Sequence, residues 1–397
     1  MRITKDLLLL TAKDTVKKAL FDSNDIVCAY LTGSIIREDP LLGGTTDIDL
    51  IFVHSLDTPI SREIFPVAED YHLDISHYPQ SFFSQPRKLR TDAWVGSFIC
   101  HYPIVLHETN HWFDYVRSAV FANFFQPANI ISRVTPFIED ARKNWVELQK
   151  NTLSIDQGFL HVYLKSISNA ANAIACLSSV PLTERRLLID FPFAAQAVNM
   201  PGLSGGLIDL IVPPDPIEPD WDSWVTNWNI AFSSLQQLDS TPLSYTEMRR
   251  PYFEKAILGL KETNNQAALW LLLWTWSFMS NRLQKNNSSQ RGFSDLLEQL
   301  MLSPDHFSER ISGLDQFLEV VEDRTEVFID LTAEATDEQA EVLVSELNKL
   351  PAIKESIFVT PEQTLVDFTS RHSHDPLMIE SLDALEENPF QGSIKLT

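Results

Sequence analysis

The order of apolar and polar positions divides the chain into an N-terminal part with mixed strand and helix signals and a longer helix-rich part. Apolar residues recur at helical spacing over residues 5–21. The segments IVCAYLTG (26–33) and DIDLIFVH (47–54) contain the apolar runs that are typical of buried strands. YHLDISHY (71–78) alternates between polar and apolar residues, which also favours a strand. The pattern therefore predicts a helix followed by strands in the first 80 residues.

Downstream, FICHYPIVLH (98–107) predicts a further strand and HWFDYVRSAVFANFF (111–125) a helix. After Pro127 the apolar spacing is helical almost throughout. The segment from Glu326 to Leu350 fits a helix, and a strand followed by a helix is the alternative. The clearest helical segments are 131–150, 157–177, 221–238 and 265–285.

We therefore expect an α+β protein in which a mixed sheet with helices is followed by a mainly α-helical C-terminal domain. VPPDPIEPD is rich in proline and acidic, which predicts a linker. The expected domains are a catalytic domain at 1–125, a helical domain closing the cleft at 126–211, a linker at 212–220, a helical C-terminal domain at 221–370 and an acidic, poorly ordered tail at 371–397.

Composition narrows the classes of protein. The 397 residues have a net charge of −23, which argues against binding to a phosphate backbone. Cys28, Cys100 and Cys176 lie far apart and lack the spacing of a disulfide framework or a zinc site. The most apolar segment, 267–279, is shorter than the roughly 20 residues of a membrane span. We expect a cytoplasmic protein that does not bind a membrane, and a homodimer remains open.

The motif TTDIDLIFV places two carboxylates in apolar surroundings. Asp47 and Asp49 are two residues apart on a predicted strand, so their side chains point to the same face. Asp74 lies at the centre of a later strand and would join them if the two strands are neighbours. Close carboxylates repel one another unless they are protonated or bridged by a cation, and oxygen ligands suit Mg²⁺ or Mn²⁺. Three carboxylates could hold two ions about 3.5–4 Å apart, as in phosphoryl transfer. Taken alone, an Asp-x-Asp pair is usually a solvated strand edge.

Gly33 and Ser34 follow the first predicted strand. A glycine there allows a phosphate to approach the backbone closely, and the next N–H groups and the hydroxyl can bind its oxygens. The combination of a Gly-Ser turn, an Asp-x-Asp strand and a strand-borne aspartate is much more specific than any of its parts.

The stretch TGS…TTDIDLIFV, with HLDIS downstream, resembles the DNA polymerase β-like nucleotidyltransferase superfamily over about the first 110 residues. The resemblance implies two Mg²⁺ ions and transfer of a nucleoside monophosphate from an NTP, with ATP the expected donor, as pyrophosphate leaves. It implies that Asp47 and Asp49 bind metal and that Asp74 is the third ligand and the base. It also implies that Gly33 and Ser34 contact the triphosphate.

The other candidate nucleotide-binding residues depart from the family's usual pattern or lie outside it. Thr46 stands where the family often has serine. The family's loop after Gly-Ser carries an early basic residue and glycine, whereas this chain reads IIREDPLLGG, so Arg37 either replaces the phosphate contact or marks a remodelled loop. On the predicted helix 157–177, His161 and Lys165 belong to a polar stripe with Asn169 and Asn172; Lys165 could reach a phosphate, or the stripe could face solvent.

Two basic clusters are weaker candidates for binding phosphate. PRKLR (86–90) fits a solvated loop, and Arg185 and Arg186 fit structural ion pairs. The regularly spaced tryptophans 221, 224, 228, 270 and 274 fit core packing between helices.

The leading hypothesis is a Mg²⁺-dependent nucleotidyltransferase whose partners are an NTP and a small, cationic acceptor of the aminoglycoside type. Two alternatives remain open: nucleotidylation of a protein or tRNA, as in toxin–antitoxin systems, and a nucleotide-binding scaffold without turnover.

Overall fold

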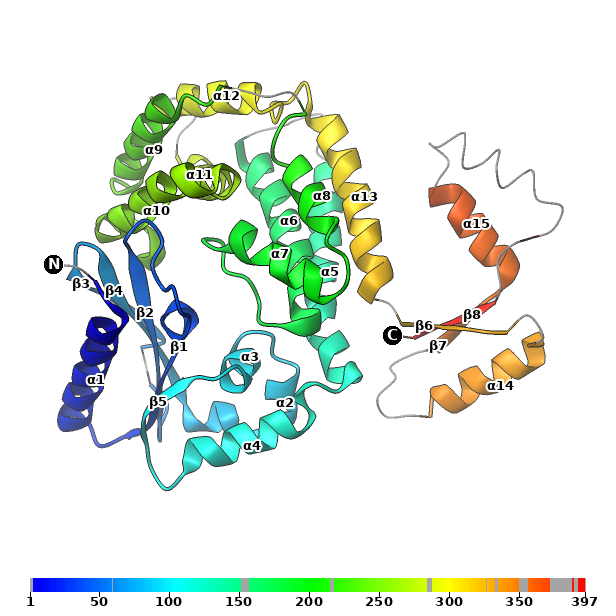
Figure 1. The fold of residues 1–397 in the computed structure, drawn as a ribbon, viewed down its shortest axis with the longest axis horizontal. Helices are drawn as coiled ribbons and strands as arrows, with labels where there is room; N and C mark the ends of the chain where they lie inside the picture. Colours follow the sequence, from blue (N-terminus) through cyan, green and yellow to red (C-terminus); the bar gives the residue numbers. More distant parts are fainter. Residues whose placement is uncertain are drawn as a thin grey trace. The chain divides into compact units, whose positions relative to one another are not determined.

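In the computed structural model the chain forms two compact units, residues 1–321 and 322–397. Figure 1 traces the elements of each unit along the chain. The structure describes residues 3–58, 60–150, 157–214, 218–283, 288–325, 327–332, 335–349, 356–371, 388 and 392–396.

The first unit begins with a five-stranded mixed sheet in the order β3-β4-β2-β1-β5. β2 and β4 run parallel to each other and the other neighbours are antiparallel. The strands are β1 (Ile26–Thr32), β2 (Thr46–His54), β3 (Arg62–Ala68), β4 (Tyr71–Pro79) and β5 (Ile104–Glu108).

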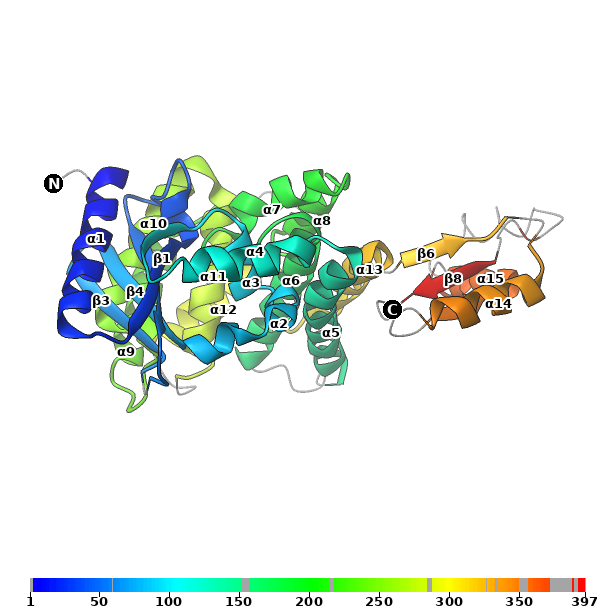
Figure 2. The same ribbon diagram turned by 90° about the horizontal axis from the view of Figure 1, so that it is seen from below.

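Alternation along β2 divides its side chains between the two faces of the sheet. Ile48, Leu50 and Phe52 share a buried cluster with helix α1 (Lys5–Asp22). Ile51 and Val53 pack in a second cluster with the short helices on the other face (Figures 1 and 2). Asp47 and Asp49 therefore lie on the same face as Ile51, at the beginning of the strand. The short helices are α2 (Pro86–Arg90), α3 (Val95–Cys100) and α4 (Trp112–Phe124).

The rest of the first unit is helical, and a large apolar cluster fills it. Trp224, Trp228 and Trp270 are buried in that cluster, which confirms the prediction of core packing for them. The helices are α5 (Pro127–Lys150), α6 (Gln157–Ser178), α7 (Leu187–Ala197), α8 (Leu203–Asp209), α9 (Trp221–Leu235), α10 (Arg250–Thr263), α11 (Asn265–Ser280), α12 (Ser289–Gln299) and α13 (Phe307–Thr325), with 3-10 turns η1 (Gly33–Ile36), η2 (Gln80–Ser84), η3 (Leu243–Tyr245) and η4 (Glu247–Arg249).

The second unit holds an antiparallel three-stranded sheet in the order β6-β8-β7. Its elements are β6 (Val327–Asp330), α14 (Asp337–Leu347), β7 (Ser356–Val359), α15 (Pro361–Arg371) and β8 (Ser393–Leu396). The prediction of a helix from Glu326 to Leu350 is therefore wrong at its start, and its strand-then-helix alternative is correct. Thr336 and Gln339 form a reciprocal capping box that begins α14 and separates it from β6.

The α+β class is confirmed, and two details of the organisation differ from expectation. The boundary after Val321 falls inside the predicted 221–370 domain, while the predicted divisions at 125 and 211 stay predictions. The segment 98–107 begins in helix α3 and becomes a strand only at Ile104. The predicted linker at 212–220 and tail at 371–397 lie partly outside the described residues.

Helix α10 docks onto the loop before β2 through two glycines. A Cβ on Gly259 would lie 2.5 Å from the Gly43 Cα, and Gly43, at φ +57°, could carry no side chain without meeting the Lys255 carbonyl. This close approach holds the middle of α10 against the loop that leads into the sheet.

We expect Gly259→Ala to lower the melting temperature, because the methyl group would force α10 away from Gly43. The matched control is Gly205→Ala in α8, where nothing lies within 4 Å of the added Cβ. That variant should gain up to about 1 kcal/mol of helix propensity and melt slightly higher. Circular dichroism measures the melting temperature of both variants. Equal changes in melting temperature for Gly259→Ala and Gly205→Ala would contradict this packing.

Candidate active site

A cavity of about 860 Å³ opens between the sheet and the helices of the first unit. The sheet side is formed by the Gly-Ser turn and by all three aspartates, Asp47, Asp49 and Asp74. β2 and β4 are neighbours, and Asp49 lies directly opposite Asp74 in their register. The structure therefore brings together the carboxylates that the motif predicted would meet.

The wall of this cavity is more basic than the protein as a whole. Its basic side chains outnumber its acidic ones by six to four, although the whole chain carries −23. The basic ones are Arg37, Arg62, Lys165, Arg185, Arg186 and Arg249, and the acidic ones are Asp47, Asp49, Asp74 and Glu184. A cationic hollow in an acidic protein favours an anionic ligand over other small molecules.

Two arginines, neither of which the motif predicted, neutralise two of the aspartates. Arg249, at the start of α10, binds Asp47 through both carboxylate oxygens, with Nη2 to Oδ2 at 2.8 Å. Arg62 of β3 binds Asp74 in the same way, with Nε to Oδ1 at 2.8 Å. Such paired hydrogen bonds are among the strongest between side chains.

Asp49 has no such partner. Among the described residues no donor binds its carboxylate, and burial together with Asp47 and Asp74 raises its pKa to about 8. A Cβ on Gly33, which has φ +70°, would lie 1.8 Å from Asp49 Oδ2. The glycine therefore makes the space that this carboxylate occupies, which explains why the turn and the Asp-x-Asp strand occur together.

The predicted nucleotide-binding residues have different surroundings. Ser34 lines the cavity, and its Oγ is 2.9 Å from the Oγ1 of Thr46, which is buried behind it and lies outside the cavity wall. Arg37 lines the cavity but is held by Asp190 of α7 at 2.8 Å. Lys165 is exposed on the cavity wall.

The polar stripe on α6 divides into two parts. His161 and Lys165 face the cavity. Asn172 is buried, where it accepts the Leu182 N–H at 2.6 Å, so that end of the stripe is structural. Burial, with Lys165 and Arg282 nearby, lowers the pKa of His161 to about 4, so its imidazole is neutral at physiological pH.

Arg185 and Arg186 do reach the cavity wall, yet their bonds are structural. Arg185 donates to the Leu42 carbonyl at 3.0 Å and lies 3.7 Å from the centre of the Tyr252 ring. Arg186 donates to the Asp39 carbonyl at 2.9 Å. In the 86–90 cluster, Arg90 donates to the Ala119 carbonyl, and none of its basic residues lines the cavity.

Aromatic rings form much of the helical side of the cavity. Tyr245 and Phe278 stack with their centres 4.0 Å apart, and Trp274 lies beside His161 at 5.4 Å. Flat rings of this kind can bind a nucleobase or an apolar part of an acceptor. Trp274 is therefore a cavity residue as well as a packing residue.

The oxygen-rich aspartate set fits a divalent cation. Three carboxyl groups face two guanidinium groups, so Asp49, beside the Gly33 turn, is the one whose ionisation no arginine among the described residues compensates. Asp49 and Asp74 would hold the ion, whose general chemistry in such sites is to stabilise charge on phosphoryl oxygens. Binding at Asp74 requires Arg62 to move.

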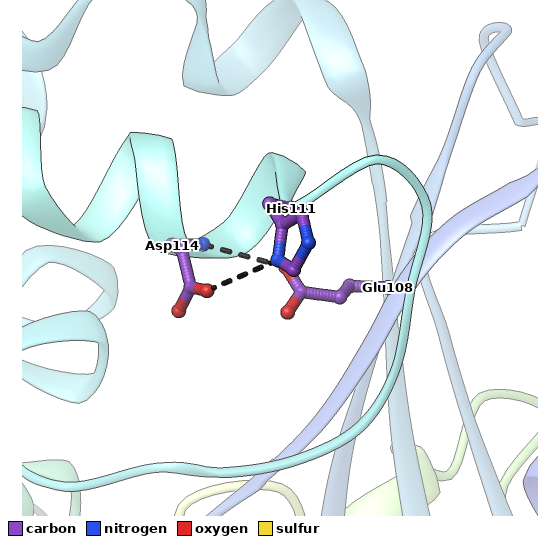
Figure 3. A group of neighbouring side chains, drawn as sticks. All are labelled: Glu108, His111 and Asp114. Carbon is purple, nitrogen blue, oxygen red and sulfur yellow. Dashed lines mark hydrogen bonds and ion pairs between the residues drawn. The ribbon is translucent and has the colours of Figure 1, made fainter.

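In the described part of the chain, one group has its potential metal-ligating atoms all within 4.8 Å of one another: Glu108, His111 and Asp114 (Figure 3). Glu108 Oε2 accepts the backbone N–H of Phe113 at 3.0 Å and so caps α4. His111 lies 3.5 Å from Asp114 on the exposed first turn. We regard this group as a helix cap.

Three comparisons with known proteins bear on these features. Residues 324–397 match the family described as the FtsX extracellular domain, which nearly coincides with the second unit. A crystal structure of a nucleotidyltransferase-like protein from Exiguobacterium sibiricum 255-15 aligns with 82% of this chain and 95% of its own, at 8% identity and a TM-score of 0.30.

A comparison with curated proteins gives no match. The described helices include none with the length and apolar character needed to cross a membrane.

Replacing Asp49 should stabilise the protein when no divalent cation is present. Its pKa is raised from 3.8 in the unfolded chain to about 8, so ionisation opposes folding increasingly as the pH rises through that interval. We expect Asp49→Asn to melt close to wild type at pH 4 and clearly higher at pH 8, in EDTA.

Asp47→Asn is the matched control and should melt lower, because Arg249 would lose its partner in a buried position. Thermal unfolding from pH 4 to 8 measures both variants. A lower melting temperature for Asp49→Asn at pH 8 would show that its charge is already compensated.

Proposed function

We propose that the first unit is a nucleotidyltransferase, which moves a nucleoside monophosphate from an NTP to a hydroxyl or amine of a small molecule. The acceptor atom attacks the α-phosphorus, the bond from that phosphorus to the bridging oxygen breaks, and pyrophosphate leaves. Asp74 takes the proton from the acceptor. Asp47 and Asp49 are the other two carboxylates of the site, and the required ion is Mg²⁺. ATP is the expected donor.

The observation that carries this proposal is the meeting of Asp49 and Asp74 in register beside the Gly33–Ser34 turn. A solvated strand edge, the ordinary setting of an Asp-x-Asp pair, would not place the carboxylates in a cavity with six basic side chains. The surplus of positive charge supports a triphosphate as ligand. The size of the cavity and the acidic outer surface support a small acceptor over an RNA end.

The helical side of the cavity supplies the rest of the substrate contacts. Lys165 is available for the phosphates, and the rings of Tyr245, Phe278 and Trp274 line the wall that a base or the acceptor would meet. Because α6 and α11 belong to the same unit as the sheet, both substrates can bind within one cavity.

Single replacements should abolish the reaction without unfolding the protein. We expect Asp49→Asn and Asp74→Asn each to reduce pyrophosphate release from an NTP by at least about 100-fold, because the charge that they supply stabilises the transition state. The measurement is release of pyrophosphate in Mg²⁺ with a panel of hydroxyl and amine acceptors. Asp22→Asn, on the exposed end of α1, is the control and should keep full activity.

Activity in Asp49→Asn equal to wild type would contradict the assignment. Transfer of labelled nucleotide to a protein or to tRNA in a cell extract, with none to small molecules, would instead support the macromolecular acceptors.

One observation favours a second function, a nucleotide-binding module without turnover. The guanidinium groups of Arg62 and Arg249 already occupy Asp74 and Asp47, as they would in a site that had no further need of metal. An NTP that raises the melting temperature but is never converted to pyrophosphate, with any acceptor, would establish that function.

A further inference from the structure

Arg249 and Arg62, which bind Asp47 and Asp74, differ in how easily a cation could displace them. The Arg249 side chain is 4% exposed and that of Arg62 is 47% exposed. The superfamily resemblance implies two divalent ions at these carboxylates, so any incoming ion competes with one arginine or the other.

Arg249 is fixed from several sides. Besides its two bonds to Asp47, its guanidinium lies 3.9 Å from the centre of the Tyr252 ring. The preceding residue is also held, because His72 Nε2 donates to the Met248 carbonyl at 2.9 Å. A cation that took Asp47 would leave the buried guanidinium of Arg249 without a carboxylate partner, which is among the costlier changes a protein interior can undergo.

Arg62 has no comparable restraint. It lies on β3, the edge strand of the sheet, and nearly half of its side chain is in solvent. Its guanidinium can turn outward and remain hydrated, so Arg62 itself loses little when a cation takes its place on Asp74. A cation that binds Asp74 therefore competes with an arginine that can leave, whereas one that binds Asp47 competes with an arginine that cannot.

The charges agree with this difference. Three carboxylates and the fixed guanidinium of Arg249 leave two negative charges, which one divalent cation neutralises. A second divalent cation would leave a surplus of two positive charges before any nucleotide binds. Asp49 and Asp74, which face each other across the β2–β4 register, remain for the one ion.

We propose that this cavity binds a single divalent cation, through Asp49 and Asp74, and that Arg249 remains on Asp47 in place of a second one. The inference rests on the proposed function. Arg249 is thus a positioning residue: it fixes Asp47 and keeps one positive charge in the site whether or not an ion is bound.

The number of Mn²⁺ ions bound per chain tests the inference without an activity assay. Mn²⁺ is titrated into the full-length chain without nucleotide, and free Mn²⁺ is followed by electron paramagnetic resonance. We expect one bound Mn²⁺ per wild-type chain and none in Asp49→Asn.

The number of bound ions distinguishes a failure of the role of Arg249 from a failure of the proposed function. Two ions in the wild type would overturn the role of Arg249 and leave the proposed function standing. No bound ion would contradict the proposed metal-dependent function itself. One ion that persists in Asp49→Asn would bind elsewhere on the chain, and this would overturn the assignment to Asp49 and Asp74.

Arginine variants give a second readout. Arg62→Gln should still bind one Mn²⁺, roughly fivefold more tightly, because the competing ion pair is gone. Arg249→Gln, if folded, should gain a second Mn²⁺. Arg87→Gln, on exposed α2, is the control and should change neither number nor affinity. Unchanged affinity in Arg62→Gln would show that Arg62 does not compete for Asp74, contrary to the inference.

Discussion

The structure of the cavity depends on how three aspartate charges are compensated where little water reaches them. An ionised carboxylate removed from water is costly unless it is paired, and the chain supplies partners for two of the three. The ion pair between Arg249 and Asp47 is the most consequential, because it joins the start of α10 to the start of β2, 202 positions away in sequence. Together with the contact between Gly43 and Gly259, it holds the helical region against the sheet at the cavity.

The third carboxylate, that of Asp49, is the one that no described arginine binds, and we expect it to bind a cation. Asp49 has a raised pKa, lies against a glycine that admits no Cβ, and has no cationic partner among the described residues. A site that keeps such a charge sacrifices folding stability, a common compromise where function requires it. The surrounding excess of basic side chains would draw an anionic substrate toward the same point.

Local patterns in the sequence were sufficient to predict much of the sheet and the placement of the Asp-x-Asp motif on it. β1, β2 and β4 follow from apolar runs and alternation, and the face shared by Asp47 and Asp49 follows from their spacing. β3 was not expected, because an edge strand with Pro66 in it has a weak signal. Arg62 was missed with it.

Long-range pairing explains the other omissions. Nothing near Arg249 in sequence marks it as a site residue, since its partner is distant along the chain, and an alignment of related sequences would be needed to detect such a pair.

In the second unit, three four-residue strands are too short to show a period, so the segment after Glu326 looked helical.

The most direct test of the central claim is anomalous X-ray diffraction from crystals containing Mn²⁺ and a non-hydrolysable NTP analogue. The account predicts a manganese peak between Asp49 and Asp74, with the triphosphate against the Gly33–Ser34 turn. A triphosphate bound elsewhere, or Arg62 unmoved on Asp74 with no manganese between the strands, would contradict it.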